Sequence, residues 1–294
     1  MRMTEPMARW ANTPTLPSLP SLSLLSLAAT LMFLPAPADA RDYLWPSAQK
    51  QTTKDTLSSR IKPPPGFERR PVPEGSFAAW LRGLPMRPSG EPVHYFNGGI
   101  KPAQVHVAVI DIDIGARDLQ QCADAIMRLR AEWQLSRGRT AEIGFNYTGG
   151  GRVTFSRWAN GERPSSDGKR WRQSAKPDRS YASFRRYMDA IFSYAGTYSL
   201  ERELKPVAIA NLAIGDVFIR GGFPGHAVLI ADIVENPVTK ERRFLLVQSF
   251  MPAQSMHILK NPSDQSTPWY PANWTGPLVT PEWTFPEGSL KRWP

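Results

Sequence analysis

The sequence of 294 residues contains a single cysteine, Cys122, and only four histidines. One cysteine cannot form an intramolecular disulfide, so the fold has to rest on its hydrophobic core. Paired-cysteine motifs and an H-E-x-x-H segment are absent, and the glycines at 149–151 are not followed by the Lys-Ser/Thr of a phosphate-binding loop. We therefore expect neither a metal nor a nucleotide cofactor.

Long apolar runs are also scarce, and the one near the N-terminus is too short to span a bilayer. Residues 19–34 are rich in leucine and uncharged, follow Arg2 and Arg9, and lead to Ala38-Asp39-Ala40. A basic segment, a short apolar segment and an A-x-A end are typical of a cleavable secretory signal peptide. The sequence predicts such a peptide over residues 1–40, a periplasmic or secreted product, and no membrane span after cleavage.

Acidic residues are fewer than basic ones, with 26 Asp and Glu against 36 Lys and Arg, a net charge of +10. Residues 1–40 contain two of each sign, so cleavage would leave the charge at +10. A basic exported protein meets anionic partners in peptidoglycan and other envelope polymers. We expect such a polymer as the partner and no nucleic acid. The alternative is that the charge serves solubility alone.

The rest of the sequence is typical of one domain behind a short leader. Residues 41–60 are polar and lead to Pro63-Pro64-Pro65, which indicates a flexible leader that ends in a stiff proline segment. No internal repeat, heptad pattern or second long linker follows. The sequence predicts a single domain over residues 61–294.

Hydrophobic periodicity predicts mixed helix and strand in this domain. Apolar residues at helical spacing indicate a long helix after a cap at Asp118, and a second helix over residues 181–194. Between them, residues 143–158 predict a hairpin and residues 159–179 a polar, basic loop. Three apolar runs separated by turn sequences predict an antiparallel meander: 216–220, 227–234 and 243–250. The expected fold class is α+β, with an antiparallel β-meander packed against a long helix.

Five longer segments together resemble a bacterial exported family known as domain of unknown function 4846. They occur in the family's order, and the resemblance extends over roughly residues 61–290. It implies kinship and brings no activity with it. The segments are Ser76–Pro85, Val109–Trp133, Phe192–Leu200, Gly215–Val228 and Gln248–Gln254.

A second resemblance concerns the order of a few polar residues. Cys122 near a helix start, His226 at the opening of a strand and Gln248 on the next strand are similar to the order in the papain-like CHAP and NlpC/P60 cell-wall amidases. The resemblance implies a papain-like fold in which Cys122 is the nucleophile, His226 is the base and Gln248 orients the base. Because 104 residues separate Cys122 from His226, residues 141–205 would be a large insertion.

The residues themselves offer chemistry that agrees with these roles. The first turn of a helix gives Cys122 free backbone N–H groups and the positive end of the helix dipole, and both favour a thiolate. The predicted hairpin register places His226 opposite Ser249 and next to Gln248, whose amide could hold the imidazole ring. The backbone N–H of Cys122 and the amide of Gln121 would form the oxyanion hole.

Two functions stay open at this point. In the first, the protein is an exported thiol hydrolase of an amide bond, with peptidoglycan stem peptides as the expected substrates. In the second, Cys122 fills the core, as a lone cysteine on an apolar helix face commonly does. The protein is then a non-catalytic envelope protein that binds wall glycans or a partner through a basic, tryptophan-rich surface. The separation of Cys122 from His226 distinguishes the two.

Other candidate groups are weaker. Asp111 and Asp113 lie two apart on a predicted strand and so share a face, where they could act as an acid pair or bind a cation. The alternative is that they pair with nearby arginines. His94, His106 and His257 have no setting comparable to that of His226.

Overall fold

The computed structural model describes residues 43–50 and 55–294. The predicted signal peptide, residues 1–40, lies outside these ranges. All of the described residues belong to one compact unit, residues 36–294. In the described ranges, no helix has the length and apolar character needed to cross a membrane.

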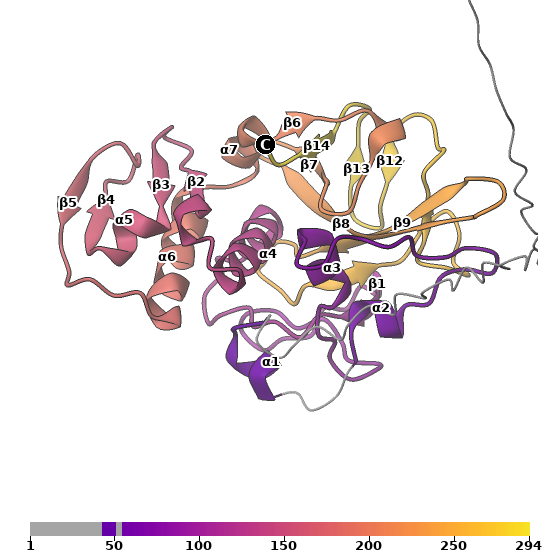
Figure 1. The fold of residues 1–294 in the computed structure, drawn as a ribbon, viewed down its shortest axis with the longest axis horizontal. Helices are drawn as coiled ribbons and strands as arrows, with labels where there is room; N and C mark the ends of the chain where they lie inside the picture. The colour runs from indigo at the N-terminus through magenta and orange to yellow at the C-terminus, as the bar shows by residue number, and fades with distance from the viewer. Residues whose placement is uncertain (1–42, 51–54) are drawn as a thin grey trace, which may run out of the picture. The chain divides into compact units, whose positions relative to one another are not determined.

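An eight-stranded antiparallel sheet is the largest part of the fold (Figure 1). Its strands follow the order β1-β10-β9-β8-β7-β14-β6, and β11 pairs with β9. Consecutive pairing of β7, β8 and β9 confirms the predicted meander and the mixed α+β class. The strands are β1 His106–Val109, β6 Lys205–Pro206, β7 Val217–Arg220, β8 His226–Glu235, β9 Arg242–Gln248, β10 His257–Leu259, β11 Tyr270–Pro271 and β14 Leu290–Arg292.

Strand β8 is buried on both faces because each face packs against a different core. Ala227 and Leu229 lie in the core beneath the helices, whereas Val228 and Ile230 lie in a second core. The alternation follows from the period of two along a strand. The C-terminal segment covers the second core with β12 Leu278–Val279 and β13 Thr284–Phe285. A strand buried on both sides carries a largely apolar run, here residues 227–231, which is why β8 is easily recognised in the sequence.

Two helices, α3 Phe77–Arg82 and α4 Cys122–Ser136, pack against β8. Helix α3 has the N-cap that its sequence indicates, because the Ser76 hydroxyl accepts a hydrogen bond from the Ala79 N–H at 3.1 Å. Shorter helical segments complete this part: α1 Pro46–Lys50, α2 Leu57–Arg60, α7 Thr197–Glu203, and the 3-10 turns η2 Thr140–Glu142 and η3 Ile209–Asn211.

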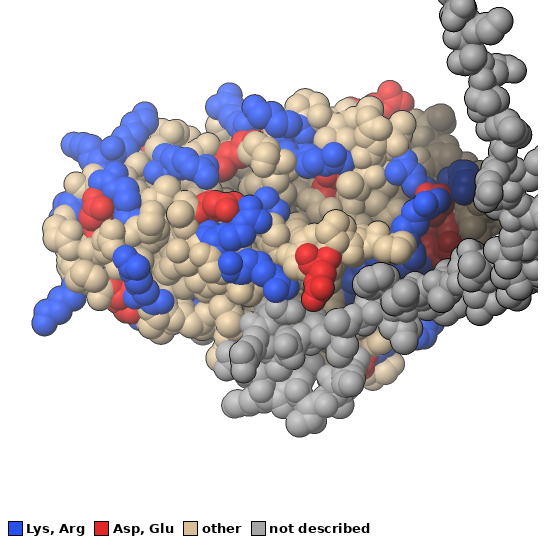
Figure 2. Space-filling view, in the orientation of Figure 1, with Lys and Arg blue, Asp and Glu red and all other residues tan. Residues whose placement is uncertain are grey.

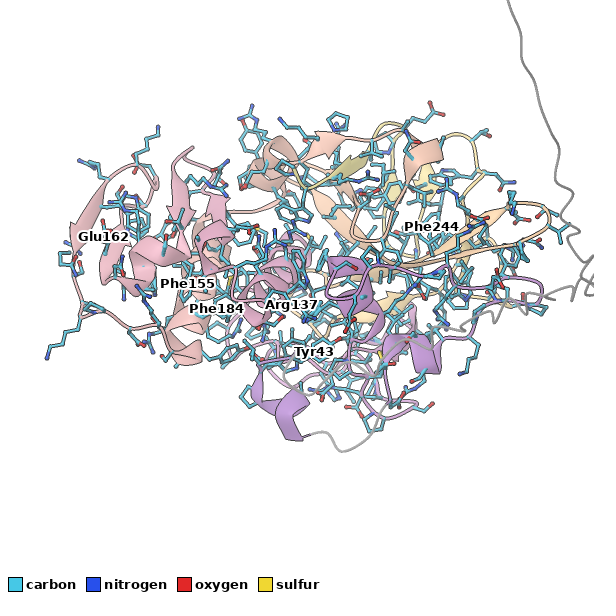
Figure 3. The ribbon with its side chains drawn as sticks, in the orientation of Figure 1. Tyr43, Arg137, Phe155, Glu162, Phe184 and Phe244 are labelled. Atoms are coloured by element: carbon cyan, nitrogen blue, oxygen red, sulfur yellow. The ribbon has the colours of Figure 1, made fainter. Side chains whose placement is uncertain are left out.

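A lobe of residues 144–194 follows α4, and α4 lies between this lobe and the sheet (Figure 1). Within the lobe, the rings of Phe155 and Phe184 pack edge to face with centroids 5.5 Å apart, well away from Phe244 of the sheet (Figure 3). The lobe contains β2 Gly144–Asn146, β3 Arg152–Thr154, α5 Phe155–Ala159, β4 Glu162–Pro164, β5 Trp171–Gln173 and α6 Tyr181–Tyr194.

The lobe agrees with the sequence prediction only in part. Helix α6 has the predicted bounds, and β2 pairs with β3 in the predicted hairpin, but residues 155–158, expected to continue the second strand, belong to α5. The range expected to be a polar loop instead contains the hairpin β4–β5. Its turn packs against the glycine run, where the Gly151 N–H donates to the carbonyl of Asp167 at 3.0 Å. A contact between chain segments holds this hairpin, so its own polar residues do not reveal it.

Part of the range expected to be a flexible leader lies in the core. Tyr43, Trp45 and Leu57 are buried. The Tyr43 hydroxyl donates to the carbonyl of Trp80 at 2.6 Å, and the Trp45 indole N–H donates to the carbonyl of Asp111 at 2.7 Å. Large aromatic side chains remove much apolar surface from water, so these few residues bind the segment to the domain.

Candidate functional site

The predicted active-site residues gather at one end of the sheet, where β8 begins, β9 ends and α4 begins. Cys122 is the first residue of α4, and Gln121 is its N-cap. The predicted cap at Asp118 is wrong, because the Asp118 carboxylate instead accepts from the Ala253 N–H at 2.7 Å and from the Gln121 amide at 2.9 Å. The Gln121 amide therefore donates to Asp118, whereas the sequence predicts it in an oxyanion hole.

Cys122 is buried at this end of the helix. Burial, together with the nearby Asp124 carboxyl, raises the pKa of its thiol to about 12. The backbone N–H groups of Ala123 and Ala227 act in the opposite direction without reversing the shift. At neutral pH the side chain is a thiol and a poor nucleophile.

His226 and Gln248 form the pair that the sequence predicts, since the His226 Nε2 lies 3.0 Å from the Gln248 Oε1. The register differs from the prediction by one residue, because Leu229 faces Val247 and the pattern extends to place His226 opposite Phe250. Their rings accordingly lie 4.7 Å apart between centroids. Gln248 reaches His226 diagonally, as neighbours two residues apart on one face can do.

Cys122 and His226 lie on different faces of β8. Ala227 shares the helix-side core with Ala123 of α4, so His226, one residue earlier, points to the other side. There its ring packs on Trp283 and Phe285, with centroids 5.4 and 5.7 Å away. No hydrogen bond joins the Cys122 sulfur to the His226 ring in the described part of the chain. The structure thus brings together two of the three predicted catalytic residues.

A polar network that the sequence does not predict extends from Gln248. Its Nε2 donates to the Glu282 Oε2 at 2.7 Å and lies 3.3 Å from the His257 Nε2. Glu282 in turn accepts from the Lys101 ammonium at 2.5 Å. These residues come from four distant segments, so no local pattern could have indicated their contact. The only available signal was the rarity of histidine in the chain.

The network settles the proton positions at His226. A carboxylate only accepts, so the Gln248 amide presents its NH2 to Glu282 and its oxygen to His226. His226 must then donate from Nε2, which leaves a lone pair on Nδ1. That atom makes no hydrogen bond to any other described residue. A neutral imidazole nitrogen of this kind can accept a proton from a ligand.

The histidines of this network are uncharged at neutral pH. Burial lowers the pKa of His226 to about 4 and that of His257 to about 3. Burial also lowers the pKa of His106, whose ring centroid lies 5.9 Å from that of His257. Desolvation thus disfavours the charged forms of the buried His226 and His257 and of the partly buried His106 beside them.

The two carboxylates near β1 serve as partners of arginines. Asp113 binds Arg128 at 2.5 Å and Arg185 at 3.3 Å, and Asp111 lies 3.5 Å from Arg87. This agrees with the arginine-partner alternative from the sequence. In the described ranges, no three His, Cys, Asp or Glu side chains are arranged to hold a metal ion. The absence of a metal or other cofactor stays a prediction.

The lobe of residues 144–194 is a second candidate site because of its charge. It contains ten Lys and Arg and four Asp and Glu, a net charge of +6 within the chain's +10. In Figure 2, basic side chains gather over the lobe with few acidic ones among them. Five exposed basic residues of the lobe form no ion pair with any described residue: Lys169, Arg170, Arg172, Lys176 and Arg179. We call the first four of these residues the basic hairpin.

Beside the basic hairpin, two other arginines of the lobe lie over aromatic rings. The Arg157 guanidinium lies over the ring of Trp171 at 4.3 Å, and that of Arg163 lies over Trp158 at 3.9 Å. Glu162 pairs with Arg157 and not with a residue of the basic hairpin. The arrangement presents positive charge to solvent on an ordered surface.

Comparison with known proteins gives kinship alone. Searches of curated proteins and of solved structures found no match to this chain. The papain-like resemblance and bacterial export therefore stay predictions. A family model described as a domain of unknown function (4846) matches residues 57–292. Because this match covers well over half of the chain, the protein belongs to the family of domain of unknown function 4846.

Proposed function

We propose that this protein is a non-catalytic envelope protein that binds an anionic polymer, with peptidoglycan and its stem-peptide carboxylates as the first candidate. The observation that carries the proposal is the basic hairpin, whose four exposed cations form no salt bridge among the described residues, although Lys169 and Arg170 lie near enough to Asp167 to help lower its pKa. An exposed charge that is not neutralised locally attracts a polyanion, and salt screens the attraction.

Export is a premise of this proposal, and it makes a prediction of its own. The exported protein should begin at Arg41, because the A-x-A sequence ends at Ala40. N-terminal sequencing of the protein recovered from periplasm or medium tests this. An exported form that retains residues before Ala38 would contradict it.

Removing charge from the basic hairpin should weaken wall binding. A variant with Lys169→Ala, Arg170→Ala and Arg172→Ala should bind purified peptidoglycan at least tenfold less tightly, since each basic residue near an anionic surface contributes about 1 kcal/mol. Co-sedimentation at rising salt concentration measures the affinity. Wild-type binding should fall with salt more steeply than that of the variant.

The matched control removes the same charge elsewhere. Lys62, Lys205 and Lys260 are also exposed and unpaired within the described ranges, and their triple alanine variant should keep near wild-type affinity. Equal losses in both variants would mean that only net charge matters and would contradict a specific site. Displacement of the protein from peptidoglycan by duplex DNA at equal charge concentration would also contradict a specific site.

Thiol hydrolysis by Cys122, His226 and Gln248 is the second candidate function. The His226–Gln248 hydrogen bond supports it, because an amide that holds Nε2 leaves Nδ1 free as a base. The burial of Cys122 and the raised pKa of its thiol oppose it. The two functions therefore differ in the expected reactivity of one sulfur atom.

We expect Cys122 in the folded protein to resist iodoacetamide at neutral pH and to react only after denaturation, with no effect of His226→Ala. Mass spectrometry of labelled protein across a pH series measures this. Rapid labelling with a midpoint below the ordinary thiol pKa of about 8.5 would restore the hydrolase. Peptidoglycan zymography would then have to show activity that Cys122→Ser abolishes.

A further inference from the structure

Three loops at the β8 and β9 end of the sheet expose large apolar side chains. Ile100 is 59% exposed, Phe223 is 85% exposed and Met251 is 57% exposed. We call these three residues the apolar tip. Phe223 lies in the loop before β8 and Met251 lies in the loop after β9. Ile100 lies in a third loop.

The three loops are neighbours in space. Strand β8 begins where its antiparallel partner β9 ends, so the loops of Phe223 and Met251 leave the same end of the sheet. The Phe96 N–H donates to the carbonyl of Ala253 at 2.8 Å, which ties the loop of Ile100 to that of Met251. Exposed apolar groups that lie together on several loops are a marker of an interaction surface.

Contacts with the rest of the fold hold the loops of Phe223 and Met251 in place. The Phe223 ring stacks on Tyr198 of α7 with centroids 6.3 Å apart, and the Thr197 hydroxyl donates to the carbonyl of Gly222 at 3.3 Å. On the other side, Asp118 holds the Ala253 N–H. The scaffold therefore holds the apolar side chains outward, in water.

Two exposed or ring-stacked arginines lie on the Phe223 side of the apolar tip. Arg220 ends β7 beside His226 and is exposed, and Arg202 lies over the Tyr198 ring at 4.2 Å. Neither forms an ion pair within the described residues. Glu282 pairs with Lys101 and Glu201 with Lys291, whereas the exposed Asp118 carboxylate beside the Met251 loop forms no ion pair within the described residues.

We propose that the apolar tip, with Arg202 and Arg220, docks on the surface of an anionic lipid bilayer. Protruding side chains from separate loops can pass between lipid headgroups, where their apolar surface leaves water. The flanking guanidinium groups then meet lipid phosphates, which attract basic side chains and bind arginine in a bidentate manner. This surface is separate from the basic hairpin and does not depend on the proposed polymer binding.

The test uses vesicles of phosphatidylglycerol and phosphatidylcholine and the chain from Arg41 onward, so that residues 19–34 contribute nothing. This part contains every described residue and forms one compact unit. The variant Phe223→Ser with Met251→Ser should bind at least an order of magnitude less tightly in vesicle co-sedimentation. The reason is that it lacks the two apolar side chains that would leave water on docking. Vesicles of phosphatidylcholine alone should bind the wild type weakly.

Two controls separate this proposal from the others. Val238→Ser with Val279→Ser removes exposed apolar groups elsewhere and should leave vesicle binding unchanged. The basic-hairpin variant should retain most vesicle binding, and the apolar-tip variant should retain peptidoglycan binding. Equal vesicle binding by wild type and apolar-tip variant would overturn the proposal. So would self-association in analytical ultracentrifugation that needs Phe223 and Met251 while vesicles bind no protein.

Discussion

Replacing Asp232 by asparagine should lower the free energy of unfolding by about 3 to 5 kcal/mol, the usual cost of removing one partner from a buried ion pair. The Asp232 carboxylate is fully buried in β8 and accepts from the Nε of Arg69 at 2.6 Å and of Arg82 at 2.7 Å. Asparagine keeps the shape but removes the charge, and its NH2 group would face a guanidinium donor. Two largely buried cations would then lack their counter-ion.

Urea denaturation followed by circular dichroism measures this loss as a lower midpoint at unchanged slope. Asp189→Asn is the matched control, because its carboxylate pairs with Arg117 on the surface. Exposed pairs contribute about 0 to 1 kcal/mol, so the control should differ little from the wild type. A loss at Asp232 no larger than that at Asp189 would show that the buried ion pair does not hold α3 against β8.

Lowering the pH from 7 to 5 should destabilise the fold by roughly 2 kcal/mol for each of His226 and His257. Both folded-state pKa values lie below the ordinary histidine value, at about 4 and about 3, because the rings are buried. Between pH 6.5 and 4 the unfolded chain binds protons that the folded protein rejects. Stability is therefore full above the unfolded pKa and falls as the pH drops toward the folded pKa.

The variant His226→Gln isolates one histidine of the pair. It cannot titrate, so its stability should fall less steeply between pH 7 and pH 5 than that of the wild type, whatever its stability at pH 7. The neighbouring groups that act on these rings, Lys101, His106 and Glu282, are the same in both proteins. Buried carboxyls with raised pKa values, such as Glu132, contribute equally to the pH dependence of stability in both proteins, so their contribution cancels in the comparison. Parallel pH profiles would contradict neutral, buried histidines.

Local chemistry made several elements predictable. Helix α6 begins after Ser180, whose hydroxyl accepts from the Ser183 N–H at 3.2 Å, and its apolar spacing alone indicates its length. Strands β7, β8 and β9 each contain an apolar run of three or more residues between turn sequences, which local periodicity also reveals.

Long-range contacts decided the rest of the fold. Asp118 looks like a helix cap in sequence, but the approach of Ala253 takes its carboxylate, and the helix begins at Cys122. The hairpin β4–β5 depends on the close contact of its turn with the glycine run. Neither contact leaves a local pattern, because its partners are distant in sequence.

In the candidate site, too, some features follow from the sequence and others from tertiary contacts. The sequence by itself determined the class of the fold, the pairing of His226 with Gln248 within one residue of register, and the excess of basic residues that makes a polyanion the expected partner. Only the tertiary structure decided that Cys122 and His226 lie on different faces of β8, and that Glu282, Lys101 and His257 complete the histidine network. The reason is that a strand changes face at every residue, so a shift of one position decides whether a side chain meets the helix or the opposite core.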